Sequence, residues 1–202
     1  TVALSVCYVV DCSGSMNGRK MDQVKAELAE SIAQLLPNQR FFVVFFSDSV
    51  QATFGGGLSP QLVEASLVSK QQALQVVFNV SSQGGTLPES AVRLAASLRP
   101  EVMYLLTDGV FEPLQEETYS ELATAGVAVH TIGFETIGTD LLLKDIASRT
   151  GGSYRAAVGS TSVSLMSMPP EVVWSYGWEP ENNSPEENLY KNYLHPKDWL
   201  GL

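Results

Sequence analysis

The chain has 202 residues, of which 45% are hydrophobic and 17% are charged, a composition typical of a globular protein with a sizeable core. Its formal net charge of -10 disfavours nucleic acid as a partner, because the phosphate backbone would be repelled. No apolar run approaches the roughly 18 residues that a membrane-spanning helix requires, so we expect a soluble or peripheral protein. The first residue is Thr1, which is compatible with a processed N-terminus, and the sequence assigns no compartment.

Strand-like and helix-like segments alternate along the first 157 residues. Apolar runs rich in β-branched and aromatic residues predict strands at residues 2–10, 41–47, 50–54, 102–107, 127–134 and 153–156. Apolar residues at helical spacing predict helices at residues 19–36, 60–77, 88–98, 114–125 and 139–149. The predicted core positions of the first two helices are Val24, Leu28, Ile32 and Leu35, and Val63, Leu67, Leu74 and Val77.

The order of these segments predicts an α/β fold. Apolar strands separated by helices are typical of a mostly parallel sheet with helices on both faces, which is a three-layer, Rossmann-like arrangement. The segment 50–54 follows so closely on 41–47 that we expect a hairpin, and therefore one antiparallel edge strand.

The last part of the chain has a different composition. Residues 160–202 hold five of the ten prolines, all three tryptophans, and six acidic residues against two lysines. Prolines and net acidity favour disorder, whereas clustered aromatic residues are typical of interfaces. We therefore divide the chain into a domain at 1–159 and an extension at 160–202. We expect the extension to be an extended arm that docks on its own domain or, as we favour, on a neighbouring subunit.

Oxygen-bearing side chains follow two of the predicted buried strands and one loop. Asp11, Ser13 and Ser15 come after the first strand, Thr86 closes a Gly-Gly-Thr loop, and Asp108 follows the strand at 102–107. In an open α/β sheet, ligands bind at the carboxyl ends of strands, near the point where the strand order reverses. Carboxylates and hydroxyls suit hard ions. The small number of charged ligands favours Mg²⁺, with Mn²⁺ or Ca²⁺ as alternatives.

The motifs D-x-S-x-S, Gly-Thr and Thr-Asp-Gly, in this order, resemble the metal-ion-dependent adhesion site of von Willebrand factor A and integrin inserted domains. The resemblance covers residues 2–157, and Asp11, Ser13, Ser15, Thr86 and Asp108 match all five ligand positions of that family. It implies that some ligands bind through water and that an acidic residue of a protein partner completes the shell. The function implied is a metal-dependent protein-binding module for adhesion or assembly, and not an enzyme.

Simpler readings exist for several of these residues. Asp11 and Asp108 are also suited to capping helices, but that reading leaves the Ser-x-Ser and Gly-Gly-Thr loops unexplained. A nucleophilic Ser13 or Ser15 would normally sit in a G-x-S-x-G elbow, which is absent here. We expect His130, inside a predicted strand, to be a packed core residue.

The two cysteines, Cys7 and Cys12, occupy a predicted strand and the loop after it. That placement does not suit disulfide geometry, so we expect both to be reduced. Cys12 stands within the D-x-S-x-S motif. Because soft sulfur is a poor ligand for a hard ion, we expect its side chain to point away from the metal.

Two other functions remain open at this stage. The chain could be a structural subunit held in a complex by its C-terminal arm, with a metal site that is not needed. It could also be a hydrolase or phosphatase that uses Ser13 or the metal. Chelation, removal of the arm, and an assay for turnover distinguish these three possibilities.

Overall fold

The computed structural model of this chain describes residues 3–55, 59–136 and 140–157. Seven strands form one sheet. They are β1 (Ser5–Asp11), β2 (Arg40–Phe46), β3 (Val50–Phe54), β4 (Val63–Glu64), β5 (Val102–Thr107), β6 (Ala128–Phe134) and β7 (Tyr154–Ala157). The α-helices are α1 (Arg19–Gln34), α2 (Leu67–Asn79), α3 (Glu89–Ser97), α4 (Glu116–Ala125) and α5 (Asp140–Thr150), and η1 (Gly14–Met16) is a single 3₁₀ turn.

The strand order is β3-β2-β1-β5-β6-β7, with β4 paired to β2 as well. Pairs β1–β2, β1–β5, β5–β6 and β6–β7 are parallel, and β3 and β4 both run antiparallel to β2. The predicted α/β class, the mostly parallel sheet and the antiparallel edge are confirmed. From β1 the chain first adds strands on one side and then, with β5, on the other. The strand order therefore reverses between β1 and β5, so a ligand crevice is expected there.

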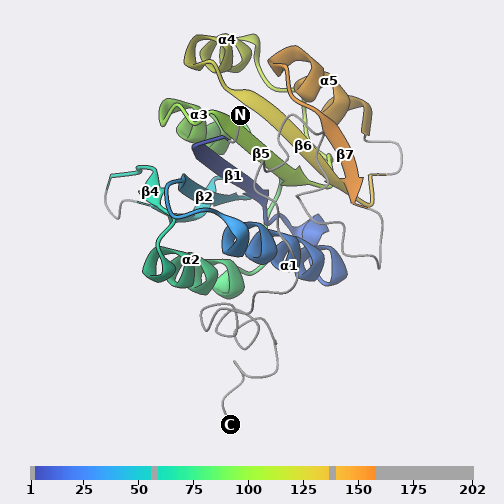
Figure 1. The fold of residues 1–202 in the computed structure, drawn as a ribbon. Helices are drawn as coiled ribbons and strands as arrows, with labels where there is room; N and C mark the ends of the chain where they lie inside the picture. The colour runs from blue at the N-terminus through green and yellow to red at the C-terminus, as the bar shows by residue number, and fades with distance from the viewer. Residues whose placement is uncertain (1–2, 56–58, 137–139, 158–202) are drawn as a thin grey trace, which may run out of the picture.

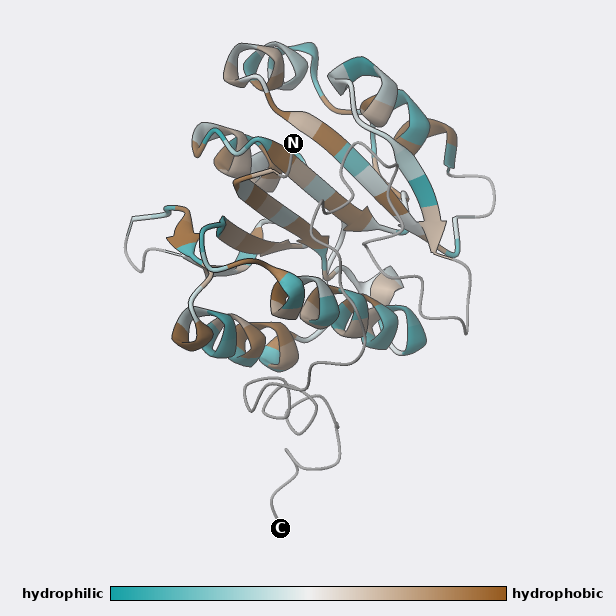
Figure 2. Ribbon diagram, in the orientation of Figure 1, coloured by the Kyte–Doolittle hydropathy of each residue, from teal (hydrophilic) through white to brown (hydrophobic). Residues whose placement is uncertain are grey.

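Helices cover both faces of the sheet, which makes three layers (Figure 1). Alternate strand residues belong to different cores: Tyr8 and Val10 pack with α1 and α2, whereas Cys7 and Val9 pack with α3 and α4. This alternation follows from the two-residue period of a strand buried on both faces. Colouring by hydropathy shows mostly apolar residues on the central strands, and helices that carry both hydrophilic and hydrophobic residues (Figure 2).

The prediction for the second helix was wrong in its start and in its buried face. Residues 63–64 form β4 instead, and α2 begins after Ser66, whose hydroxyl caps the helix by accepting a hydrogen bond from Ser69 N at 3.2 Å. Leu67 is 47% exposed, and the side chains that α2 buries are Lys70, Ala73 and Val77. Hydropathy alone cannot find this face, because its first member is a lysine.

Lys70 is buried because it has partners at the end of α1. Its Nζ donates hydrogen bonds to the carbonyls of Ala33 and Leu35, which lie where α1 runs out of intrahelical donors. The predicted core positions of the first helix, Val24, Leu28, Ile32 and Leu35, are all buried, and Leu35 is the C-cap residue of α1.

Several expectations fall on other parts of the chain. Residues 158–202 lie outside the described residues, and so do the predicted boundary after 159 and the predicted arm. Cys7 and Cys12 are free, as predicted, and both are buried. Among the described helices, none is both long and apolar enough to cross a membrane.

Candidate metal centre

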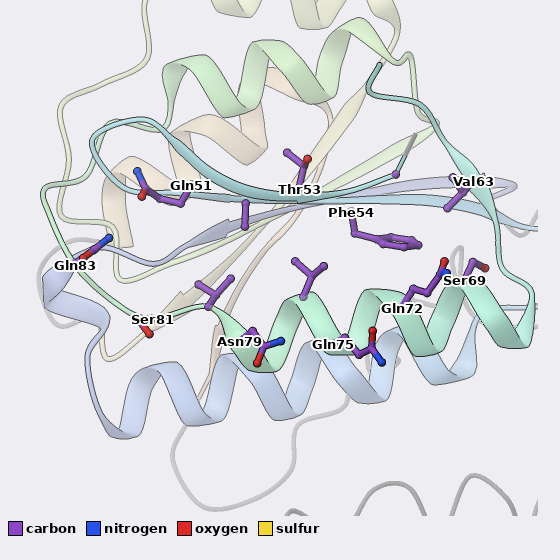
Figure 3. A pocket seen from close by; sticks show the side chains of 14 residues that line it. Gln51, Thr53, Phe54, Val63, Ser69, Gln72, Gln75, Asn79, Ser81 and Gln83 are labelled. Atoms are coloured by element: carbon purple, nitrogen blue, oxygen red, sulfur yellow. The ribbon is translucent and has the colours of Figure 1, made fainter. Parts of the chain in front are cut away.

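A hollow of about 890 Å³ lies between β3 and α2 (Figure 3). Its lining includes the apolar side chains of Phe54 and Val76 and the amide side chains of Gln72, Gln75 and Asn79. The residues that line it include no charged side chain. A cation would find no counter-charge in this hollow, so the ion chemistry predicted from the sequence has to lie elsewhere.

Two carboxylates meet at the switch point of the sheet. Asp11 is the last residue of β1, and Asp108 directly follows β5, the parallel neighbour of β1. Asp11 is 0% exposed and Asp108 is 2% exposed. Burial of a carboxylate is unfavourable unless hydrogen bonds or an opposite charge offset it, so the partners of these two groups decide what the site can bind.

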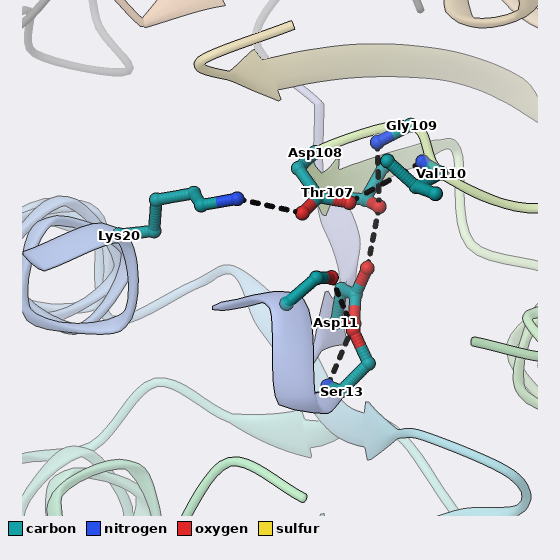
Figure 4. Close-up of polar contacts among 8 residues, drawn as sticks. Asp11, Ser13, Lys20, Thr107, Asp108, Gly109 and Val110 are labelled. Carbon is teal, nitrogen blue, oxygen red and sulfur yellow. Dashed lines mark hydrogen bonds and ion pairs between the residues drawn. The ribbon is translucent and has the colours of Figure 1, made fainter. Parts of the chain in front are cut away.

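Asp11 is held by hydrogen bonds to both of its oxygens (Figure 4). The backbone N–H of Ser13 donates to Oδ1 at 2.8 Å, and the hydroxyl of Thr107 donates to Oδ2 at 2.6 Å. Burial raises the pKa of the Asp11 carboxyl, the hydrogen bonds from Ser13 and Thr107 lower it, and the charge of Asp108 raises it further. The net direction is upward, so the charged form of Asp11 is disfavoured unless a cation approaches.

The loop after β1 is anchored by apolar side chains, and its serines face the site. Cys12 and Met16 are both 0% exposed, and the Cys12 thiol donates to the carbonyl of Phe46 at 3.2 Å. Between these anchors, Ser13 Oγ and Ser15 Oγ lie 3.1 Å apart. Burial raises the pKa of the Cys12 thiol to about 11. The prediction that Cys12 points away from the site is confirmed.

The Gly-Gly-Thr loop is brought to the same edge by backbone hydrogen bonds. Gly14 N donates to Gly84 O at 2.9 Å, and Gln83 N donates to Cys12 O at 2.9 Å. Asp48 fixes the loop from its other side, because its Oδ1 accepts from Gly85 N at 2.8 Å. Gly84 has a φ of +77°, and a Cβ at this position would run into the Asp48 carboxylate. Glycine is therefore needed where the loop closes over Asp48.

Thr86 is the next residue of this loop and is half-buried. Direct hydrogen bonds connect Asp11 with Ser13 and Ser13 with Ser15. Thr86 is connected to this group only indirectly, through the backbone hydrogen bonds between its own loop and the loop after β1.

Asp108 is paired with a cation from α1. Lys20 Nζ lies 2.8 Å from Asp108 Oδ2, and the N–H of Val110 donates to Asp108 Oδ1 at 3.3 Å (Figure 4). Sequence reasoning did not find this lysine. It stands nine residues after Asp11, in a helix that also holds Arg19 and Lys25, and nothing in the pattern separates it from a solvent-facing residue.

Two other residues, Thr107 and Asp48, support the site without belonging to the predicted ligand set. The Thr107 hydroxyl bridges the two strand ends, since it donates to Asp11 and accepts from Gly109 N at 3.1 Å. Asp48 holds the glycine loop. Thr107 is the last residue of β5, and Asp48 lies two residues beyond the end of β2. Both positions were a usable signal, because polar residues at the carboxyl ends of buried strands face the ligand edge.

The donor set fits a hard divalent cation. It offers two carboxylates and several hydroxyls, and all of them are oxygen ligands. Among the described residues there is no group of three or more His, Cys, Asp or Glu that could hold an ion, so hydroxyls have to supply part of any shell here.

His130 has no part in this centre. It lies in β6, is buried, stacks on Tyr104 at 5.4 Å between ring centroids, and its Nδ1 lies 2.8 Å from Ser153 Oγ. The prediction of a packed core histidine is confirmed.

The von Willebrand factor type A domain family matches residues 4–156, which is most of the chain and includes all the elements described above except the last residue of β7, Ala157. The chain therefore belongs to this family. Its members generally mediate protein–protein contacts, and nothing in the described residues points to catalysis.

Solved structures with the same fold include a von Willebrand factor type A protein from Catenulispora acidiphila, with a TM-score of 0.63 and 24% identity over 78% of this chain and 39% of that one. An aerotolerance-related membrane protein from Bacteroides fragilis has a TM-score of 0.61 and 16% identity over 77% of this chain and 92% of that one.

A third similar structure is proximal thread matrix protein 1 from the mussel byssus, described with a zinc-occupied MIDAS motif. It has a TM-score of 0.57 and 22% identity, over 77% of this chain and 41% of that one. This chain thus spans about two fifths of the length of the Catenulispora and mussel proteins.

Proposed function

We propose that this domain binds one divalent cation, Mg²⁺ in the first place, and through it a protein partner that supplies a carboxylate. The ligands are Asp11, Ser13, Ser15, Thr86 and Asp108. The observation that carries the proposal is the pair Asp11 and Asp108, two nearly inaccessible carboxylates at the ends of adjacent strands. A bound cation offsets the cost of burying both charges.

The resemblance to metal-ion-dependent adhesion sites supports the ligand set, and so does the mussel protein of the same fold, whose MIDAS motif is described as zinc-occupied. The donors in this chain are all oxygens, which favour Mg²⁺ or Mn²⁺ over zinc. When bound, the ion would carry a positive charge, and a carboxylate of the partner could complete its coordination shell. The protein residues hold the loops in place: Thr107 orients Asp11, and Asp48 orients the loop that carries Thr86.

The rim of the site supports binding of a protein rather than of a small ion alone. Leu87 follows Thr86, Val110 follows Gly109, and each is 55% exposed. Exposed apolar side chains beside a charged centre suit a partner whose acidic residue is flanked by apolar ones. Because the overall charge of -10 does not steer an acidic partner, these flanking contacts have to supply the specificity.

A hydrolase is less well supported by the geometry. Ser13 Oγ lies against Ser15 Oγ. Histidine occurs only at position 130 among the described residues, where it is engaged with Ser153. A serine nucleophile needs a base within hydrogen-bond reach.

The test is calorimetric titration of the full chain with Mg²⁺. We expect binding of one ion, and loss of binding in Asp11→Ala, because a charged ligand is removed. Asp22→Ala is the matched control, since Asp22 is an exposed aspartate of α1 and its removal changes the net charge equally. Unchanged affinity in Asp11→Ala contradicts the proposed site.

Partner binding is tested by a pull-down with and without a chelator, and with a chain that lacks residues 160–202. Loss on chelation supports the metal-dependent mode. Loss on truncation alone, with no effect of chelation, supports the alternative of a structural subunit held by its C-terminal arm.

A further inference from the structure

Lys20 reaches from the first turn of α1 into the candidate metal centre. Its Nζ lies 2.8 Å from Asp108 Oδ2, and the side chains of Lys20 and Asp108 are 19% and 2% exposed (Figure 4). An ammonium group is thus held against one of the two carboxylates that the proposed function assigns to the metal.

This ion pair differs from the exposed pairs of the same domain. Lys144 and Asp140 on α5 are 50% and 31% exposed, so solvent screens their attraction. The start of α1 is fixed by Met21 and Val24, which are buried in the core. The backbone of Lys20 is therefore held in place, whereas its four-carbon stem can still turn.

We propose that Lys20 is a resident cation that competes with the divalent ion for Asp108, and so sets the Mg²⁺ concentration at which the site fills. The inference rests on the proposed function. An ion bound to Asp108 Oδ2 at about 2.1 Å would share this oxygen with an ammonium that now lies 2.8 Å from it. Two cations on one carboxylate oxygen repel each other. The lysine head therefore has to withdraw when the ion binds.

Competition of this kind has a consequence for the metal-free domain. Lys20 pairs with Asp108 there and offsets part of the cost of burying that carboxylate. The ion gains the attraction of both carboxylates but has to displace the ammonium. Its affinity is lowered by the free energy of the Lys20–Asp108 contact.

The experiment uses the full chain and Mg²⁺ alone. Lys20→Met keeps much of the length of the side chain and removes the charge. Calorimetry should show Mg²⁺ binding tightened by about tenfold. Lys20→Arg keeps the charge and should stay within about threefold of the unmodified chain. Lys144→Met removes one positive charge from an exposed ion pair on α5, and it measures how much of any gain comes from the more negative net charge.

Melting temperature gives a readout that does not depend on calorimetry. With chelator present, Lys20→Met should melt below the unmodified chain, because Asp108 loses its counter-charge. With saturating Mg²⁺ the difference should vanish or reverse, so the stabilisation by Mg²⁺ is larger in the variant. Lys20→Gln, a second neutral variant, should behave in the same way.

Three outcomes overturn the inference. Equal or weaker Mg²⁺ affinity in Lys20→Met overturns it alone, and leaves the proposed function standing. A melting temperature lowered equally with and without Mg²⁺ shows a purely structural lysine and overturns it as well. Absence of Mg²⁺ binding by the unmodified chain overturns the proposed function and this inference together.

Discussion

The middle of β1 and its carboxyl end bury side chains of opposite kinds. Val9 and Val10 are completely buried among apolar neighbours, and Asp11, the next residue, is buried equally. Removing an aliphatic side chain from water contributes about 1.5–3 kcal/mol, whereas removing a carboxylate raises the free energy. One strand therefore stabilises the fold along most of its length and opposes folding at its end.

The same contrast holds on β5. Leu105 and Leu106 are buried in the two cores, and Thr107 and Asp108 follow them with 0% and 2% exposure. Polar groups buried at neighbouring strand ends, where they contribute little to stability, indicate a site kept for binding. We call the apolar middle of the strands the body of the sheet, and the carboxyl ends of β1 and β5 its edge. The comparison predicts that substitutions in the body change stability, whereas substitutions at the edge change metal binding.

The largest effect on stability is expected in the body of the sheet. Phe45→Ala, in β2, removes a completely buried ring and should lower the free energy of unfolding by about 3–5 kcal/mol. Leu141→Ala is the control, because Leu141 is 75% exposed and should change stability by less than about 0.5 kcal/mol. Urea unfolding with chelator present measures both. Similar losses in the two variants contradict the assignment of the core.

At the edge, Asp11→Asn should weaken Mg²⁺ binding strongly and change stability little. With chelator present the free energy of unfolding should change by less than about 1 kcal/mol, because a buried charge is removed while the size and most of the polar contacts remain. Mg²⁺ binding in calorimetry should weaken by about a hundredfold or more. A loss of stability as large as that of Phe45→Ala would show that the Asp11 carboxylate is a structural group, and the contrast between body and edge would fail.

A smaller effect on Mg²⁺ affinity is expected from Asp48, which supports the edge of the sheet but is not one of the proposed ligands. Asp48→Ala removes the acceptor of Gly85 N–H and frees the loop that carries Thr86. We expect Mg²⁺ affinity to fall by about tenfold, which is the range seen when residues that orient metal ligands are removed. Asp145→Ala, on the exposed side of α5, is the control for the lost charge. Equal affinities of the two variants would mean that Asp48 does not position the loop.

The sequence was sufficient to predict the strands in the body of the sheet and some of the polar residues at its edge. The strand at 102–107 was predicted to the residue, since an apolar run between Pro100 and Asp108 leaves little choice. The start of α2 was missed because Val63 and Leu67 continue a helical spacing that β4 and the Ser66 cap interrupt. That interruption depends on pairing with β2, which no local pattern reveals.

At the edge, motif residues could be named because their spacing is distinctive. Lys20 could not, because its role depends on where α1 lies relative to β5, more than 80 residues further along the chain. The contact is tertiary, and a lysine in the first turn of a helix has no pattern that marks it.

The smallest effect concerns a titratable group in the body. Burial lowers the pKa of His130 below its ordinary value of 6.5. Ser153 N–H donates to His130 Nδ1 at 3.1 Å, which requires Nδ1 to carry no proton. Between the lowered folded pKa and 6.5, the unfolded chain binds more protons than the folded one. The contribution of His130 to stability is therefore complete above about pH 6.5 and is lost as the pH falls through this window.

His130→Phe keeps a ring to stack on Tyr104 and cannot titrate. With chelator present, the fall in the free energy of unfolding between pH 6.5 and 5 should be smaller in this variant by about 1 kcal/mol or less. Chemical unfolding at several pH values measures it. Parallel curves for the variant and the unmodified chain would mean that His130 keeps an ordinary pKa. The body of the sheet would then be insensitive to mild acid, and any loss of stability in that range would have to originate in other groups.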